Sequence, residues 1–115
     1  MKMFVEPDQI YLHRDFVDFR KSINGLTELV ENSLERDAYT GELFIFCNKS
    51  KDKIKLLYWD KTGFALWYKR LDKHKFKWPS KINEQSLALD VQQLDWLLSG
   101  FDVLGHETLN YQSLL

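Results

Sequence analysis

The sequence predicts an α+β fold: an antiparallel β-meander of four to five strands with two helices packed on one face. Hydrophobic and polar residues alternate through much of residues 43–78, which is the period of a β-strand. Short turns separate these runs, so consecutive strands must be antiparallel. Apolar residues near residues 22–35, and again after residue 90, recur at three- and four-residue spacing, which is the period of a helix.

The predicted meander has four strands joined by turns rich in Asn, Asp, Ser and Gly. They are Leu43–Asn48, Lys53–Asp60, Phe64–Leu71 and His74–Trp78. The last of them stops at Pro79, which cannot donate to a strand ladder. Ile10–Leu12 and Gln85–Leu89 are candidates for further short strands.

Two helices are expected from their apolar stripes and their end signals. The first covers residues 22–35, and Ser22 is a suitable N-cap. The second begins at Asp90, because Asp90 and Gln93 have the spacing of a capping box. Gly100 suits the C-terminal cap of this second helix.

Length and composition predict one domain, residues 1–101, followed by a C-terminal tail, residues 102–115, that is partly disordered. A chain of 115 residues with 44% hydrophobic residues can bury a core without a metal or a disulfide. Cys47 is the only cysteine, lies in an apolar run and is expected to be a buried thiol. No apolar run approaches the roughly 20 residues of a membrane span. With no signal peptide in view, a cytoplasmic location is expected.

Charge is segregated along the chain although the formal net charge is only −1. Residues 49–81 hold eleven basic and three acidic residues, whereas the remainder holds five basic and fourteen acidic residues. The same middle segment contains three of the four tryptophans. Positive charge concentrated among aromatic residues is typical of a surface that meets phosphate.

The lysines near the end of this segment have the spacing of one strand face. Lys73, Lys75 and Lys77 alternate with His74, Phe76 and Trp78, so a strand would present a row of ammonium groups roughly 6–7 Å apart. That spacing is close to the spacing of phosphates along a nucleic-acid strand. The alternative is that these lysines provide solubility and protect strand edges. The basic side chains predicted to contact nucleic acid are Arg20, Lys21, Lys49, Lys51, Lys53, Lys55, Lys69, Arg70, Lys73, Lys75 and Lys77.

Most aromatic side chains in the predicted strands are expected in the core. Trp59, Tyr68 and Trp78 are the predicted exceptions, because they neighbour lysines and have polar tips that can face water. On a nucleic-acid-binding sheet such rings can stack on bases. Arg20 precedes the first helix, where a cation opposes the helix dipole. We therefore expect Arg20 to have a fixed partner, either a carboxylate of the same chain or a phosphate.

Catalytic and metal sites find little support in the sequence. Asp52, Asp60 and Asp72 fall in predicted turns, where turn chemistry accounts for them. The three histidines are dispersed and lack metal-ligand spacing. No cofactor or catalytic residue is therefore predicted, and a nuclease is the least favoured hypothesis.

Several stretches resemble a known family. Residues 17–26, VDFRKSINGL, resemble its early D-x-R-K-x-x-x-G-L segment, and residues 43–71 with 76–79 resemble its central signature. With residues 94–100 the similarity covers nearly all of residues 10–101. The family is the TnpB-type, Orf2-like accessory protein of insertion sequence 66 elements. The resemblance implies a bacterial mobile element whose transposase is a separate protein, and no catalytic residue is established for the family.

Two functions therefore remain open. The first is a non-catalytic accessory protein for transposition that contacts the DNA backbone through basic hairpins, because lysine suits phosphate contact better than base readout. The second is an adaptor that binds the transposase of the same element without touching DNA. The expected partners are accordingly DNA and that transposase, with no membrane and no small-molecule cofactor.

Overall fold

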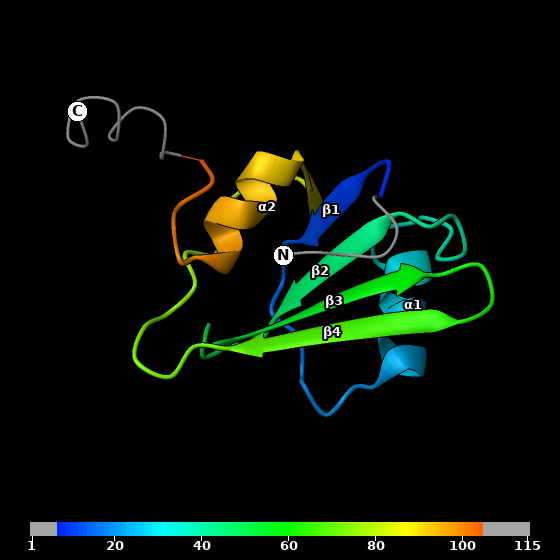
Figure 1. The fold of residues 1–115 in the computed structure, drawn as a ribbon, viewed down its shortest axis with the longest axis horizontal. Coiled ribbons are helices and arrows are strands. Elements are labelled where there is room, and N and C mark those ends of the chain that lie inside the picture. The colour runs from blue at the N-terminus through cyan, green and yellow to red at the C-terminus, as the bar shows by residue number, and fades with distance from the viewer. Residues whose placement is uncertain (1–6, 105–115) are drawn as a thin grey trace.

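A computed structural model of the chain describes residues 7–104 and contains one five-stranded sheet with two helices (Figure 1). The strands lie in the order β4-β3-β2-β1-β5. In chain order the elements are β1 (Ile10–His13), α1 (Ile23–Asn32), β2 (Leu43–Cys47), β3 (Lys53–Trp59), β4 (Phe64–Arg70), β5 (Ser86–Leu89) and α2 (Val91–Leu98). The α+β class predicted from the sequence is confirmed.

All neighbouring strands of the sheet pair in antiparallel fashion except β1 and β2. β2, β3 and β4 form the expected meander, with Ile45 opposite Leu56 and Leu56 opposite Trp67. β1 pairs with β2 in parallel, because the chain passes through α1 between them. β1 also pairs with β5 in antiparallel fashion. The two further short strands proposed from the sequence are thus β1 and β5, which lie next to each other at one side of the sheet.

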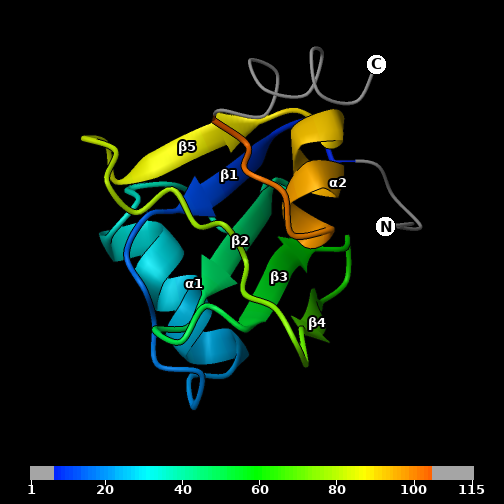
Figure 2. The same ribbon diagram turned by 90° about the vertical axis from the view of Figure 1, so that its left-hand side faces the viewer.

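The two helices lie on opposite faces of the sheet, so the prediction that both pack on one face is wrong (Figure 2). Every residue of β2 is buried, and its side chains alternate between two hydrophobic clusters. Phe44 and Phe46 pack with Leu26 and Val30 of α1. Leu43, Ile45 and Cys47 pack in the cluster of α2. A strand covered on both faces is uniformly apolar, and Leu43–Cys47 has that composition.

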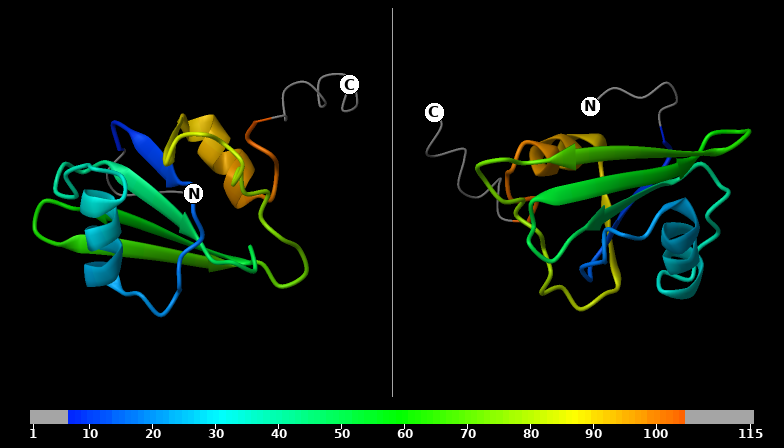
Figure 3. Two further views of the ribbon diagram at one scale, coloured as in Figure 1. Left: turned by 180° about the vertical axis from the view of Figure 1, so that it is seen from behind. Right: turned by 90° about the horizontal axis from the view of Figure 1, so that it is seen from below.

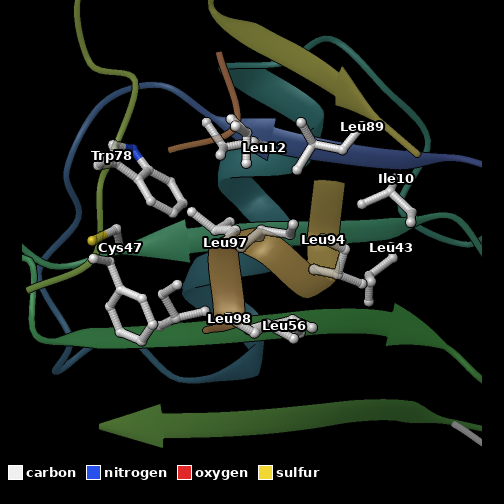
Figure 4. Close-up of a cluster of buried hydrophobic side chains, with 14 residues drawn as sticks. Ile10, Leu12, Leu43, Cys47, Leu56, Trp78, Leu89, Leu94, Leu97 and Leu98 are labelled. Carbon is white, nitrogen blue, oxygen red and sulfur yellow. The ribbon is translucent and has the colours of Figure 1, made fainter. Parts of the chain in front are cut away.

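The larger cluster lies between the sheet and α2 (Figure 4). Leu94, Leu97 and Leu98 of α2 belong to this cluster, and Trp78 lies at one end of it. Asp90 caps α2 with the predicted capping box, since its side chain accepts from the Gln93 amide. α1 begins one residue after Ser22 as expected, although the Ser22 side chain makes no capping hydrogen bond.

The predicted fourth strand, residues 74–78, is not a strand. The segment does not pair with β4 and lies instead against the 48–52 turn, where the Phe76 amide donates to the Lys51 carbonyl at 2.7 Å. Phe76 and Trp78 are buried in the α2 cluster while Lys75 and Lys77 are exposed. The alternation of lysines with apolar residues therefore reflects burial of one side of an irregular segment. It does not reflect hydrogen-bonded pairing with a neighbouring strand.

Packed structure continues beyond residue 101, because Val103 is 1% exposed in the α2 cluster. The remainder of the predicted tail, residues 105–115, lies outside the described residues. Within residues 7–104, no helix has the length and apolar character needed to cross a bilayer.

Candidate nucleic-acid interface

The basic middle of the chain folds around one end of the sheet, which we call the basic end. It consists of the 48–52 turn between β2 and β3 and the 71–81 segment that follows β4, and these lie side by side (Figures 1 and 3). Two backbone hydrogen bonds join them. The Leu71 amide donates to the Asp52 carbonyl at 2.8 Å, and the Phe76 amide donates to the Lys51 carbonyl at 2.7 Å. Lysines far apart in sequence are therefore brought to the same place.

Asn48 organises the 48–52 turn. Its side-chain oxygen accepts from the backbone amides of Asp52 at 3.1 Å and Lys53 at 3.0 Å. Its side-chain nitrogen donates to the Asp52 carboxylate at 2.7 Å, and this bond is the main cause of the lowered pKa of Asp52. Lys51 has a φ of 62°, so the turn reverses through a left-handed residue. The side chain of Asn48 thus fixes the shape of the turn that carries Lys49 and Lys51.

One group of cations at the basic end has no ion pair with any described residue. Lys73, Lys75 and Lys77 are exposed on the 71–81 segment, and Lys49 is exposed on the turn. Lys51 is half-buried and lies 5.8 Å from the centre of the Phe16 ring. We call this set the free lysines: Lys49, Lys51, Lys73, Lys75, Lys77 and the neighbouring Lys81.

Three of the free lysines border one shallow hollow of about 390 Å³. Lys51, Lys77 and Lys81 contribute to its walls, and the Trp78–Pro79 stretch forms its apolar side. Asp102 lies at the same hollow, so its lining is mixed in charge. Lys49 borders a different hollow, of about 540 Å³, together with Asp15 and Asp18. The free lysines thus surround the basic end on more than one side.

Three other predicted cations are paired with carboxylates of the same chain. Arg20 binds Asp18 at 2.6 Å, Lys53 binds Asp52 at 3.3 Å and Arg70 binds Asp72 at 3.0 Å. Hydrogen bonds from Arg20 lower the pKa of Asp18 to about 2. The expectation that Arg20 has a fixed partner is met by a carboxylate two residues away. The Arg20–Asp18 and Arg70–Asp72 pairs are exposed and therefore weak, so they can exchange for other anions, whereas the Lys53–Asp52 pair is half-buried.

Two predicted contact lysines are held by the protein itself. The Lys55 side chain is buried, and its Nζ donates to the carbonyl oxygens of Phe19 at 2.9 Å and Lys21 at 3.0 Å. Burial lowers the pKa of Lys55. On the other face of the sheet, Lys69 Nζ donates to the Leu98 carbonyl at the end of α2, at 2.9 Å. Lys55 and Lys69 therefore do not belong to the candidate interface.

The three aromatic residues predicted to face a ligand lie in three different places. Trp78 is 6% exposed and donates from its indole nitrogen to the Arg14 carbonyl at 3.0 Å, so its ring is not available for stacking. Trp59 lies at the opposite end of the sheet, packed edge-on against Tyr39 and Phe64. Tyr68 alone is exposed near predicted cations, beside Phe19 and Lys55.

No cluster of three His, Cys, Asp or Glu side chains that could hold a metal occurs among the residues that the structure describes. Cys47 is buried, and desolvation raises the pKa of its thiol to about 12. His13 is also buried, with its ring nitrogens bonded to the Asp15 carbonyl and the Ser33 hydroxyl. The side chains of Cys47 and His13 are both buried inside the fold.

Residues 8–107 match the family described as IS66 Orf2 like protein, a span that includes the whole basic end. The chain belongs to this IS66 Orf2-like family. The family implies an accessory role in transposition of an insertion sequence.

Two relatives of this IS66 Orf2-like protein come from Sinorhizobium fredii (strain NBRC 101917 / NGR234). The uncharacterized protein y4jC is 36% identical over 86 residues, which is 75% of this chain and 73% of y4jC. The uncharacterized protein y4hO is 32% identical over 94 residues, or 82% of this chain and 81% of y4hO. No solved structure shows significant similarity to the chain.

Sequence reasoning omitted Lys81 from the candidate contacts of this IS66 Orf2-like protein. It lies beyond Pro79, where the predicted strand had ended, yet it shares the hollow of Lys51 and Lys77. Its membership of the basic segment was the only signal available in the sequence. Its proximity to Lys51 depends on the contact between the 48–52 turn and the 71–81 segment.

Proposed function

We propose that this IS66 Orf2-like protein serves transposition by binding the DNA backbone at its basic end. The observation that carries the proposal is the position of Lys73, Lys75 and Lys77. All three side chains are exposed and form no ion pair with a described residue. Their segment is hydrogen-bonded through its backbone to the 48–52 turn. Free ammonium groups gathered at one end of a rigid sheet can replace the counterions of successive phosphates.

The proposed contact has little base specificity. The free cations are all lysines, which bind phosphate as point charges and lack the planar fork that arginine uses to read guanine. Trp78 is buried, so it adds no stacking platform at the basic end. Arg20 and Arg70 are exposed, and they could join the interface only by exchanging Asp18 and Asp72 for phosphate.

Salt-dependent DNA binding tests the proposal. Affinity of the full chain for duplexes of unrelated sequence is measured by fluorescence anisotropy at several salt concentrations. With six phosphate contacts, the slope of log affinity against log salt is expected near −5. The triple variant Lys73→Gln, Lys75→Gln, Lys77→Gln should flatten that slope by about three, because each lost contact removes about one unit.

A matched control compares two single variants at opposite ends of the sheet. Lys75→Gln lies at the basic end, and Lys61→Gln lies in the exposed turn between β3 and β4. Only Lys75→Gln should flatten the slope, by about one unit. Equal effects of both variants would indicate a general charge effect and would contradict a localised interface.

The second candidate function, an adaptor for the transposase, makes a different prediction. The adaptor has support from the exposed aromatic group at the far end of the sheet, where Tyr39 is 54% exposed against Trp59 and Phe64. If the pure chain fails to bind DNA at low salt while it still captures the transposase, the adaptor is correct and the DNA proposal is wrong.

A further inference from the structure

β4 is an edge strand whose first five residues lack the usual protection against pairing. It pairs only with β3, over seven residues and in continuous register, so no bulge twists it away. Its first five residues, Phe64–Tyr68, include no charged residue and no proline. The other edge strand, β5, has only four residues. Figures 1 and 3 show β4 along the outer margin of the sheet.

The hydrogen bonds at the two ends of the hairpin determine which backbone groups of β4 point outward. The Asp60 amide donates to the Gly63 carbonyl, and the Leu71 amide donates to the Asp52 carbonyl. Hydrogen-bonded and non-hydrogen-bonded pairs alternate along an antiparallel ladder. Ala65, Trp67 and Lys69 therefore direct their backbone groups toward β3. The backbone groups that point away from the sheet belong to Phe64, Leu66, Tyr68 and Arg70.

No described residue bonds to those outward backbone groups. An unpaired row of alternating donors and acceptors is a template for another strand. We propose that β4 pairs in antiparallel fashion with β4 of a second copy of this chain, so that the two sheets form one continuous sheet.

The positions of the outward groups define the register. Full overlap places Phe64 opposite Arg70 of the second copy and Leu66 opposite Tyr68 of the second copy. All four are outward residues, so each such pair can exchange two hydrogen bonds. The symmetry axis then passes beside Trp67, whose ring meets its own counterpart in a non-hydrogen-bonded pair, where side chains are closest.

Charge selects the antiparallel arrangement. Lys69 and Arg70 are the only charged residues of β4, and both lie at its C-terminal end. A parallel in-register pairing would place these cations opposite their own copies, which is destabilising. The antiparallel register places them opposite uncharged Ala65 and Phe64. The resulting contact is two-fold symmetric, so it closes as a dimer and does not propagate.

The first test is the mass of the full chain in solution by analytical ultracentrifugation at micromolar concentration. We expect twice the 13.8 kDa mass of one chain. Tyr68→Pro removes an outward amide and leaves the bonds to β3 intact, because Tyr68 does not donate to β3. It should raise the dimer dissociation constant at least about tenfold. Tyr68→Ala removes the same ring but keeps the amide, and it should remain dimeric.

The second test is the register itself. Trp67→Cys places two thiols opposite each other on the symmetry axis, close enough for a disulfide. Ala65→Cys lies on the same face of β4, but its partner is Lys69, so its thiols are too far apart to link. Mild oxidation should cross-link Trp67→Cys and leave Ala65→Cys monomeric on a denaturing gel. The native Cys47 is buried and does not interfere.

This inference concerns an interface separate from the basic end and does not need DNA binding to be correct. A monomeric wild-type chain would overturn it. A dimer that survives Tyr68→Pro with native circular dichroism, or that cross-links through Ala65→Cys in preference to Trp67→Cys, would place the contact elsewhere and would overturn it equally.

Discussion

Lys55 Nζ donates a hydrogen bond of 2.9 Å to the carbonyl oxygen of Phe19, thirty-six residues earlier in the chain. A second bond, of 3.0 Å, reaches the Lys21 carbonyl, and the ammonium group lies 4.8 Å from the centre of the Phe19 ring. One buried cation thus fastens the loop before α1 to the middle of β3. Lys55 lies within the basic residues 49–81, but its role is to stabilise the fold through these two hydrogen bonds.

Lys55→Met is expected to destabilise the protein by about 1–3 kcal/mol, because it leaves two carbonyls in the loop without their donor. Denaturant unfolding measures the change. Lys75→Met is the matched control, since Lys75 is exposed and its loss should alter the unfolding free energy by no more than about 0.5 kcal/mol. Equal stability of the two variants would contradict the role assigned to Lys55.

Trp78→Phe should lower stability by about 1–2 kcal/mol, because it removes the indole donor to the Arg14 carbonyl and keeps most of the buried ring. Trp78→Ala should cost about 3–5 kcal/mol. DNA affinity of Trp78→Phe should equal that of the wild type, because the ring is only 6% exposed. A weakened affinity for single strands, without a change of fold, would instead support base stacking by Trp78.

Stability should fall as pH decreases below 6.5 because of His13. Burial lowers its pKa in the folded protein, so between the folded pKa and 6.5 the unfolded chain binds a proton that the folded chain does not. The loss is at most about 1.4 kcal/mol for each pH unit. His13→Gln should remove this slope. Asp18, paired with Arg20, has its pKa lowered from 3.8 to about 2, so it affects the pH dependence of stability only below about pH 3.8. That dependence at low pH should persist in the variant.

Cys47 should not react with a thiol reagent such as Ellman's reagent in the native protein at pH 8. Desolvation raises its pKa to about 12, so the reactive thiolate is scarce, and the side chain is buried. The thiol should react fully once denaturant unfolds the chain. Fast labelling of the folded protein would show that β2 opens readily or that Cys47 is exposed.

Much of the fold follows from local patterns in the sequence. The strands of the hairpins, the capping box of Asp90 and the position of α1 depend on neighbouring residues, so periodicity and turn chemistry predict them. The run Leu43–Cys47 also carries a signal for the arrangement of the helices. Five consecutive apolar residues indicate a strand buried on both faces, and hence helices on both sides of the sheet.

The class of fold, the family resemblance and the concentration of positive charge in residues 49–81 can all be predicted from the order of the residues. The three-dimensional packing determines which of those charges lack an ion pair within residues 7–104. Lys55 and Lys75 look alike in sequence, since both are lysines in alternating segments. Lys55 is buried and donates to carbonyls of the loop before α1, whereas Lys75 is exposed on the 71–81 segment at the basic end. Whether a charged side chain can meet a ligand depends on its burial and on partners that distant parts of the chain supply.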